Sequence, residues 1–523
     1  MRGDSKMPIL GAYSVIMDKE RCISWKMPGK CATCVEVCPH SVFSIDDMGR
    51  AYVLNDLACV GCKICVENCP GNAIYVRSLE PERFSRGLWT SQVIEEIHYK
   101  AETGKYLLRG FGTMGLMPHF DDLVIVPAQL YPPAPKDKYR EECNTEVVIG
   151  EGRVKKPLRL KIPVMFAAMS YGAISREAKI AIAIATAKMG IAACTGEGGS
   201  FPEEYYLVHG YKSEEDFKRG KKTYEPGGQL IVQWASGRWG VSIDYLNRSD
   251  AIEIKIGQGA KPGMGGHLLG EKVTKEIAEI RGIPVGTDCL SPCRHYDICD
   301  VKEDLRKQIE LLRDVTGYEK PIIVKLGPGR IYKDVKIAAE AGADAIAIDG
   351  AQGGTGAAPE AAIQTAGVPT IACIPPAVRA LKDLGLRDEV KLIVMGGIRS
   401  GADVVKALAL GADCVAIASA ALIAMGCRVC TQCLKGRCPY GITSQDPELR
   451  KRLQPRKAAE RLVNFLKAMA EEIKMLTMLA GHDDIRQLSK EDLRALDINV
   501  AAITGVKLAG LERCIPSNWI EEV

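Results

Sequence analysis

The feature that most constrains the fold is a group of eight cysteines between Cys22 and Cys69, arranged in two similar runs. The first run is Cys22, eight further residues and then CATCVEVCP, and the second is CVGCKICVENCP starting at Cys59. Disulfides are scarce in reducing compartments, so thiols clustered this closely are more typical of metal sites. The two runs predict a small, duplicated metal-binding module at the amino-terminal end.

The second run has the C-x2-C-x2-C-x3-C-P spacing of bacterial-type ferredoxins, in which three close thiolates hold one cluster and the fourth ligates the other. The ligand sets of two [4Fe–4S] clusters should therefore cross over. The expected sets are Cys22, Cys31, Cys34 and Cys69 for one cluster, and Cys59, Cys62, Cys65 and Cys38 for the second. Cys22 departs from the pattern, because eight residues separate it from Cys31. Zinc is the alternative for C-x2-C pairs, but two Cys-Pro endings, followed by apolar strands predicted at 41–45 and 73–76, favour an electron-carrying module of α+β fold.

Composition adds little beyond the cysteines. The chain has 523 residues, a formal net charge of +4 and 47% hydrophobic residues, so bulk charge favours neither a nucleic-acid nor a membrane partner. No apolar run reaches the roughly 18 residues of a membrane span, and the first residues lack the build of a signal peptide. We expect a cytoplasmic protein with two or three folded units.

From about residue 160, short apolar runs alternate with longer amphipathic stretches, which predicts α/β structure with a parallel sheet. Eight such runs suggest a (βα)8 TIM barrel, whose active site lies at the carboxyl ends of the strands. The predicted strands are Pro163–Met169, Ile191–Cys194, Ala251–Ile256, Pro321–Leu326, Ala345–Ile348, Thr370–Ile374, Leu392–Met395 and Cys414–Ala418.

Glycine-rich segments follow most of these runs, and glycine lets backbone amides approach an anion closely. A barrel usually binds phosphate with the loops after its seventh and eighth strands. Gly396, Gly397 and the turn after Ala418 are therefore expected to hold the phosphate of FMN, with a plain tight turn as the alternative for any single glycine stretch. Lys325 is expected to place a cation near the flavin N1–C2 edge, with a solvated or salt-bridged lysine as the alternative. Further flavin-binding candidates at the strand ends are Ala168, Met169, Ser170, Asp349, Gly353, Gly354 and Thr355.

The stretches MSYGAIS, TGEGG, IVQWASGRWGV, IKIGQGAKPGMGGHL, DGAQGGTGAAP and GCRVCTQCLKGRCPYG, in this order, resemble the synthase region of glutamate synthases. The resemblance covers roughly Phe120 to Leu496, and the fused ferredoxin module resembles the short archaeal-type form. It implies an oxidoreductase acting on CH–NH2 donors, dependent on NADPH or ferredoxin. Reduced FMN would deliver a hydride to 2-iminoglutarate, formed from 2-oxoglutarate and ammonia, to give L-glutamate.

The same resemblance implies roles for residues in the matched motifs. Glu197 would be the acid/base carboxylate, although a carboxylate at a helix start is an alternative. Gln258 and Lys261, implied to be catalytic as well, would hold the carboxylates of 2-oxoglutarate together with Arg281, which rests on position alone. The residues expected to complete the pocket, for which a purely structural loop is an equal alternative, are Gln233, Ser236 and Arg238.

The third cysteine group carries another family feature. Cys427, Cys433 and Cys438 keep the C-x5-C-x4-C spacing that in this family ligates a [3Fe–4S] cluster next to FMN. Cys430 is a departure, because a fourth thiolate could complete a [4Fe–4S] cluster instead. We favour three irons. In either case this cluster would receive electrons from the ferredoxin module and pass them to the flavin.

The expected domains are a ferredoxin-like domain (1–80), a linker and barrel entry segment (81–160), the FMN barrel (161–426), a cluster loop (427–445) and a helical tail (446–523) with a long helix at Ala458–Leu479. Neither a glutaminase nor a G-x-G-x-x-G unit for a nicotinamide is found. Ammonia should come from free ammonium or a separate glutaminase, and electrons from an NAD(P)H-oxidising flavoprotein or a ferredoxin. We therefore expect a hetero-oligomer.

Three other functions compete with this interpretation. The barrel could use methylamine and form N-methylglutamate, and the sequence separates the two amines poorly. The chain could be an electron-transfer flavoprotein subunit, but a relay has no use for the dicarboxylate pocket of Glu197, Gln258 and Lys261. A phosphate-binding barrel such as an inosinate dehydrogenase shares the strand end at Gly396 and explains none of the cysteines.

Overall fold

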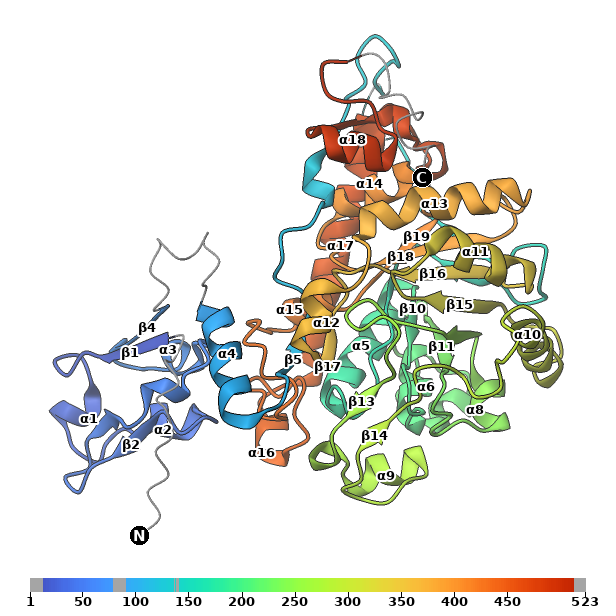
Figure 1. The fold of residues 1–523 in the computed structure, drawn as a ribbon. Coiled ribbons are helices and arrows are strands. Elements are labelled where there is room, and N and C mark those ends of the chain that lie inside the picture. The colour runs from blue at the N-terminus through green and yellow to red at the C-terminus, as the bar shows by residue number, and fades with distance from the viewer. Residues whose placement is uncertain (1–12, 79–90, 136, 138–140, 512–523) are drawn as a thin grey trace.

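The computed structural model describes residues 13–78, 91–135, 137 and 141–511. The two cysteine runs form a small module, drawn in blue in Figure 1, that stands beside a much larger α/β body. In the module, β1 (Tyr13–Met17) pairs antiparallel with β4 (Ile74–Ser78), and β2 (Phe43–Ile45) pairs with β3 (Ala51–Val53). Its short helices are α1 (Ile23–Lys26), α2 (Thr33–Val37) and α3 (Ile64–Glu67). The two strands predicted after the Cys-Pro endings are therefore present as β2 and β4.

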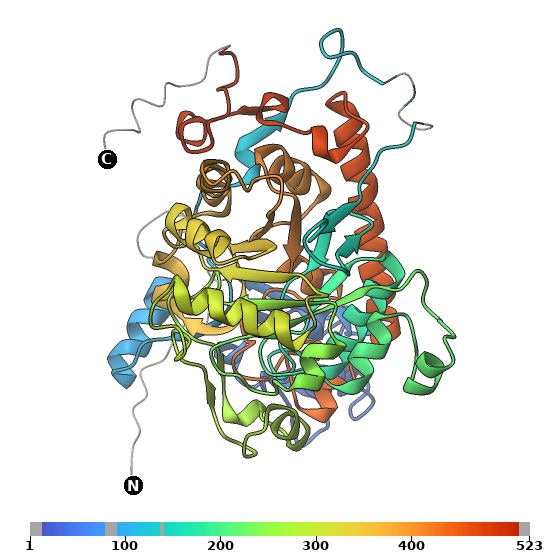
Figure 2. The same cartoon turned by 90° about the vertical axis from the view of Figure 1, so that its right-hand side faces the viewer.

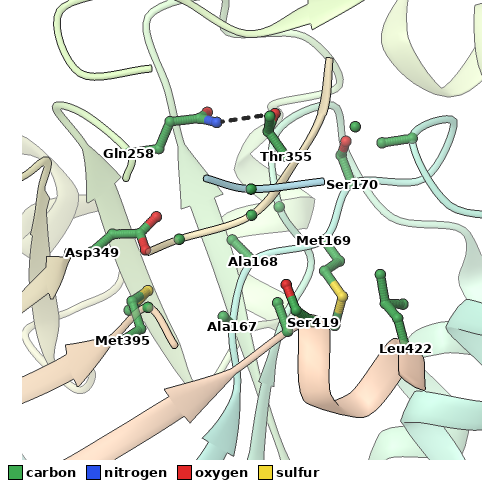
Figure 3. A pocket seen from close by; sticks show the side chains of 18 of the residues that line it. Ala167, Ala168, Met169, Ser170, Gln258, Asp349, Thr355, Met395, Ser419 and Leu422 are labelled. Carbon is green, nitrogen blue, oxygen red and sulfur yellow. Dashed lines mark hydrogen bonds between the residues drawn. The ribbon is translucent and has the colours of Figure 1, made fainter. Parts of the chain in front are cut away.

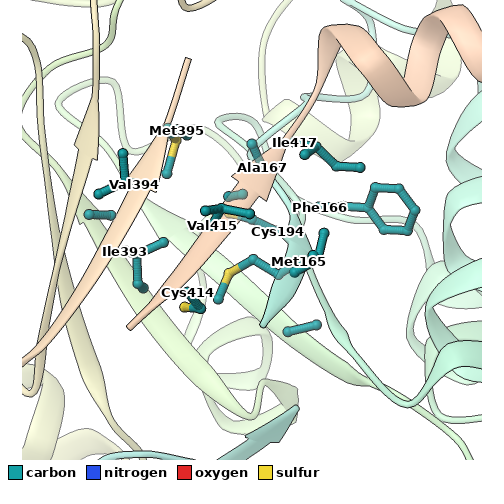
Figure 4. Packing of buried hydrophobic residues seen from close by; sticks show 14 of the residues in the cluster. Met165, Phe166, Ala167, Cys194, Ile393, Val394, Met395, Cys414, Val415 and Ile417 are labelled. Atoms are coloured by element: carbon teal, nitrogen blue, oxygen red, sulfur yellow. The ribbon is translucent and has the colours of Figure 1, made fainter. Parts of the chain in front are cut away.

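Eight of the described strands close into a parallel barrel, which confirms the predicted fold class. The barrel strands, in the order of their pairing, are β9 (Val164–Phe166), β10 (Ala192–Cys194), β11 (Gln229–Trp234), β12 (Ala251–Lys255), β15 (Ile322–Leu326), β16 (Ala345–Asp349), β18 (Lys391–Met395) and β19 (Cys414–Ile417). Apolar side chains fill the interior: Figure 4 shows Met165, Cys194 and Cys414 packed between the strands, each at most 5% exposed. The barrel is thus a packed core, and a ligand must bind at its rim.

One of the predicted strands is wrong. Thr370–Ile374 begins helix α13 (Thr370–Asp383), which starts directly after Pro369 and continues through Pro375 and Pro376. The barrel strand that the sequence analysis did not predict is β11, whose apolar centre is flanked by glutamines. Periodicity alone does not distinguish a short buried helix segment from a buried strand, which is why both assignments failed together.

Helices surround the barrel, as Figures 1 and 2 show from two directions. The predicted long helix is confirmed as α17 (Pro455–Leu479), which packs on α5 and α14 and so completes the helical layer. The other described helices of this body are α5 (Arg176–Met189), α6 (Pro202–Val208), α7 (Glu214–Lys218), α8 (Ile243–Arg248), α9 (Lys275–Arg281), α10 (Glu303–Val315), α11 (Ile331–Glu340), α12 (Glu360–Thr365), α14 (Gly401–Leu410), α15 (Ser419–Ala424), α16 (Pro447–Arg450) and α18 (Ile498–Thr504). Within the described part of the chain, every helix is too short or too polar to cross a membrane.

Paired strands outside the barrel join distant parts of the chain. β5 (Leu108–Phe111), which follows α4 (Ser91–Thr103), pairs with β17 (Thr355–Pro359) at the barrel rim. The remaining pairs are β6 (Leu123–Ile125) with β20 (Leu493–Ala495), β7 (Val147–Ile149) with β8 (Leu158–Leu160), and β13 (His267–Leu268) with β14 (Cys289–Leu290). The segment that leads into the barrel is therefore part of the rim.

Candidate active site

A cavity of about 780 Å³ lies at the carboxyl ends of the barrel strands, where Figure 3 shows lining side chains from the segment after β9 and from β16, β18 and α15. The sequence-predicted residues that line it are Ala168, Met169, Ser170, Glu197, Gln233, Gln258, Lys261, Arg281, Lys325, Asp349, Gly353, Gly354, Thr355, Gly396, Gly397, Ala418 and Cys433. Residues at or just after the ends of all eight barrel strands, and from the cysteine loop, thus face a single space.

Glycines shape one half of the cavity, which we call the glycine cradle and define as Gly353, Gly354, Gly396 and Gly397. Gly396 and Gly397 have φ angles of +106° and +76°, which L side chains rarely adopt. A Cβ atom on Gly354 would lie 2.6 Å from the Ser419 hydroxyl, and one on Gly397 would lie 3.0 Å from the Gln352 side chain. The backbone is therefore exposed where a phosphate group needs to approach it, and the cradle fits the phosphate end of FMN.

Lys325 projects from β15 into the floor of the cavity and is 4% exposed. Burial alone would lower its pKa, but the carboxylates of Glu253 and Asp349 outweigh that effect and the pKa is raised. Asp349 Oδ2 lies 3.8 Å from Lys325 Nζ and accepts a hydrogen bond of 2.8 Å from the amide of Gly259. Lys325 is therefore a permanent cation next to the cradle, suited to the charge that develops on a reduced flavin.

Charged side chains shape the other half of the cavity, which we call the charged half and define as Glu197, Lys255, Lys261 and Arg281. Glu197 follows β10, is 8% exposed and pairs with Lys255 of β12 at 2.8 Å. Burial raises the pKa of Glu197. The charge of Lys255, a hydrogen bond from Ser291 and the charge of Arg281 lower it by more than burial raises it, so the net shift is downward. Glu197 is thus ionised, and its Oε1 has no hydrogen-bond partner.

Lys261 and Arg281 of the charged half retain N–H donors that make no hydrogen bond. Lys261 is 3% exposed and donates to the carbonyl of Ala357 at 2.6 Å. Burial, and then the neighbouring charge of Lys255, lower its pKa to about 7, although Glu197 opposes this. Arg281 donates from Nη2 to the carbonyl of Tyr171, while its buried Nε has no partner. With Lys255 and Lys325, these cations outnumber the lining carboxylates of Glu197 and Asp349, so the cavity attracts anions.

Two predicted pocket residues do not line the cavity. The Ser236 hydroxyl donates to the carbonyl of Pro292 at 2.7 Å. Arg238 pairs with Asp297 and stacks on Trp234, 4.0 Å from the ring centroid. Both side chains therefore fix the loop that follows β11, which is the structural alternative stated for this segment. Gln233 does line the cavity, where its amide donates to Glu253.

The third cysteine group lies beside the cavity, and Cys433 lines it. Burial and the neighbouring thiols Cys433 and Cys438 raise the pKa of Cys427 to about 11. Burial and then Cys438, Cys433 and Cys62 raise the pKa of Cys430 to about 12. All four thiols of this group are therefore gathered in one place, and buried thiols of this kind ionise when a metal supplies the opposing charge.

The module cysteines are grouped as the crossed ligand sets require. Cys22, Cys31, Cys34 and Cys69 line one small cavity, next to Ser24. In the other set, burial and the neighbouring Cys62, Cys38 and Cys59 raise the pKa of Cys65 to about 12. The described lining of the first cavity contains these four thiols and no histidine or carboxylate, and the charges that raise the pKa of Cys65 are those of three further thiols, which fits iron–sulfur clusters.

The module binds the cysteine loop through the second of these sets. Tyr440 donates from its hydroxyl to the carbonyl of Cys62 at 3.0 Å, and Arg428 pairs with Glu67. Arg452 donates to the carbonyl of Val37, next to Cys38, at 2.8 Å. The set containing Cys38 and Cys62 therefore faces the third cysteine group. Helix α1, which directly follows Cys22, lies on the side of the module away from the large body (Figure 1).

Sequence reasoning missed several residues of the site. Lys255 lies within the motif IKIGQGAKPG and ends strand β12, so its position at a strand end was an available signal. Ser291, which bonds Glu197, and Phe111 of β5 follow no comparable pattern. They reach the site only because the segments that carry them fold back over the rim.

Comparisons with known proteins decide the family. A family model described as the conserved region in glutamate synthase matches residues 126–483, more than half of the chain. The chain belongs to the glutamate synthase family. A second model, for a 4Fe-4S dicluster domain, matches residues 29–74. The predicted family, and the ferredoxin-like domain that precedes the barrel, are thereby confirmed.

Several curated relatives have a similar length. The archaeal-type glutamate synthase [NADPH] of Thermotoga maritima is 40% identical over 97% of this chain and 99% of its own length. The archaeal glutamate synthase [NADPH] of Archaeoglobus fulgidus is 37% identical over 98% of this chain and 99% of its own length. Among solved structures, a mandelate oxidase with a monooxide FMN adduct covers 72% of this chain and 89% of its own, at 19% identity and a TM-score of 0.42.

Proposed function

We propose that this chain is the synthase subunit of a glutamate synthase, which forms L-glutamate by reductive amination of 2-oxoglutarate. One observation carries the proposal: a single buried cavity joins the glycine cradle, an excess of buried cations around Glu197, and Cys433 of the cysteine loop. A phosphate-bearing flavin, a dianionic substrate and an electron-carrying cluster thus have adjacent places.

The charged half suits a small dicarboxylate. Lys261 and Arg281 approach from the loop after β12 and from α9, and both keep unpaired N–H donors. They would bind the two carboxylates of 2-oxoglutarate, and the Gln258 amide, which contacts Thr355 at 3.4 Å (Figure 3), would orient the substrate. The keto carbon would then lie between Glu197 and the flavin side of the cavity.

The Glu197–Lys255 pair accounts for the proton transfers. As ammonia adds to the keto carbon, ionised Glu197 accepts a proton from the nitrogen through its free Oε1. Lys255 donates one proton to the keto oxygen, and Glu197 returns to the same oxygen the proton that it took from the nitrogen. The oxygen then leaves as water and gives protonated 2-iminoglutarate. Reduced FMN, when bound in the cradle, supplies the hydride that converts the imine carbon to the CH–NH2 group. One further proton on the nitrogen completes glutamate.

The cluster ligands follow the cysteine groups. We assign one [4Fe–4S] cluster to Cys22, Cys31, Cys34 and Cys69, another to Cys38, Cys59, Cys62 and Cys65, and a [3Fe–4S] cluster to Cys427, Cys433 and Cys438. Such clusters supply electrons one at a time. Cys430 distinguishes a three-iron from a four-iron cluster, because only the four-iron cluster needs its thiolate. A Cys430→Ser variant should keep the EPR signal of an oxidised three-iron cluster. Loss of a four-iron signal in this variant would contradict the three-iron assignment.

Ammonia would come from a separate glutaminase subunit or from free ammonium, and electrons from an NAD(P)H-oxidising flavoprotein or a ferredoxin. These partners make a hetero-oligomer the expected assembly. We expect a reducing compartment such as the cytoplasm, because clustered thiols are kept from forming disulfides there.

An anaerobic experiment tests the function. The purified chain is reduced with dithionite, the excess reductant is removed, and 2-oxoglutarate and ammonium are added while flavin absorbance and glutamate are measured. We expect reoxidation and glutamate only when both substrates are present. A flavin that stays reduced would contradict a self-sufficient synthase site. Methylamine in place of ammonium serves as the competing amine, and the comparisons do not favour it as the substrate.

A further inference from the structure

Lys272 is a buried lysine that the proposed reaction does not use. It ends the short helical turn Gly270–Lys272 and is 4% exposed. Its ammonium donates to the carbonyl of Cys433 at 2.9 Å and to the carbonyl of Ala173 at 3.3 Å. One of these acceptors belongs to a proposed cluster ligand, and the other to a residue that lines the flavin cavity. Lys272 therefore joins the two sites directly.

The charge of Lys272 is not balanced by a carboxylate. Both of its hydrogen-bond acceptors are backbone carbonyls, and no ion pair joins it to a carboxylate within the described chain. A buried ammonium with carbonyl partners alone is costly, because dipoles do not replace the lost hydration of a full charge. The opposing charge must come from the cysteine loop.

The stem of Lys272 also packs on that loop. A Cβ atom on Gly436, which lies between Cys433 and Cys438, would meet the Lys272 side chain at 3.6 Å. Gly436 has a φ of +64°, so the loop turns at the point where the lysine passes. The ammonium and its stem together therefore follow the loop from Gly436 to Cys433.

We propose that Lys272 is the buried counter-cation of the third cluster and that it raises the midpoint potential of this cluster. The proposal rests on the cluster assigned to Cys427, Cys433 and Cys438 above. A cluster bound by thiolates carries net negative charge, and one-electron reduction adds a further negative charge. A cation held against the loop of ligands would stabilise the reduced form more than the oxidised form, which favours acceptance of an electron from the ferredoxin module.

The test is a potentiometric titration of the purified holoenzyme, followed by the EPR signal of the third cluster. Lys272→Met removes the charge with little change in length. We expect the ratio of reduced to oxidised cluster at a fixed potential to fall at least tenfold, which is about 59 mV for a one-electron couple. Lys275→Met removes an exposed lysine of the next turn and should leave the potential unchanged.

Lys272→Arg keeps the positive charge and separates charge from packing. Potential and iron content near wild type in the arginine variant, with a lowered potential or a lost cluster in the methionine variant, would support the proposal. Equal behaviour of the two variants, or a full cluster with unchanged potential in Lys272→Met, would overturn it. If the wild-type chain itself contains no third cluster, the proposed function fails at that point, and the result is distinguishable from both outcomes above.

Discussion

The two halves of the cavity bind by different means. The glycine cradle presents backbone at left-handed turns and owes its shape to the absence of side chains, whereas the charged half presents Glu197, Lys255, Lys261 and Arg281 with donors and acceptors left unused. The cradle suits a cofactor that stays bound, and the charged half suits a substrate that must arrive, react and leave. Substitutions in one half should therefore spare the function of the other.

The largest effect is expected from the charged half. Glu197→Gln keeps the size of the side chain and removes the proton acceptor, so kcat should fall by about 10²–10⁴. FMN content should remain at the wild-type level, because Glu197 lies outside the cradle. Anaerobic flavin reoxidation with glutamate analysis measures the change in kcat. The absorbance ratio of flavin to protein measures the FMN content.

Glu214→Gln is the matched control, since it makes the same change on an exposed part of α7. Loss of FMN in the Glu197 variant would show that the two halves are coupled. A kcat within threefold of wild type would remove Glu197 from the proposed proton transfer.

The cradle gives the next effect. Gly397→Ala and Gly385→Ala both place a side chain at positive φ, +76° and +69°, which costs about 1–2 kcal/mol of unfolding free energy in each case. The two positions differ in surroundings, because a Cβ atom on Gly385 meets nothing within 4 Å, whereas one on Gly397 meets Gln352 at 3.0 Å. Only Gly397→Ala should weaken FMN binding, by at least tenfold or about 1.4 kcal/mol.

FMN dissociation constants and thermal unfolding of both variants check this expectation. Equal FMN affinity in the two variants would mean that the cradle does not hold the cofactor. A changed affinity for 2-oxoglutarate in flavin-saturated Gly397→Ala would again indicate coupling between the halves.

A pH dependence should mark the charged half alone. Burial and Lys255 lower the pKa of Lys261 to about 7, so this side chain is a cation below pH 7 and neutral above it. Because the cationic form binds the anionic substrate, the affinity for 2-oxoglutarate should be full below pH 7 and fall above it, by up to about tenfold per pH unit. Difference spectra of the bound flavin measure this affinity without involving ammonia.

Lys261→Met should bind 2-oxoglutarate weakly at every pH and give a flat profile. An unchanged slope above pH 7 in this variant would assign the titration to another group. FMN affinity should not follow the same curve, since the neighbouring charges of Glu253 and Asp349 raise the pKa of Lys325.

The cysteine groups and the barrel differ in how far the sequence predicts them. Three cysteines of each module set come from one short run, and the fourth comes from the other run, so the ferredoxin spacing is enough to predict the grouping. The predicted number of barrel strands is right, yet Thr370–Ile374 is helical and β11 escaped prediction, because a short apolar run is compatible with either element. Motif matching placed Glu197 and Lys261 together in the cavity.

The residues that escaped prediction depend on contacts between segments far apart in the chain. Ser236 lies in a matched motif, but the carbonyl of Pro292, more than fifty positions later, holds its hydroxyl away from the cavity. Phe111 reaches the rim because β5 pairs with β17, nearly 250 positions later. Local pattern carries no information about such pairings, whereas strand ends of a parallel barrel converge whatever lies between them.

The smallest effect is expected at the contact between the module and the cysteine loop, outside both halves. Tyr440→Phe removes the hydrogen bonds to the Cys62 carbonyl and to Glu67, worth about 1 kcal/mol or a factor of about five in local opening. Amide hydrogen exchange around residues 62–67 should rise accordingly, while Tyr52→Phe, an exposed tyrosine of the same module, should leave it unchanged. Because neither half of the cavity contacts this hydroxyl, affinities for FMN and 2-oxoglutarate should stay at their wild-type values. A shift in either affinity would mean that the contact between the module and the cysteine loop affects the cavity through Cys433. The binding of FMN and 2-oxoglutarate would then depend on how the electron-carrying module is held.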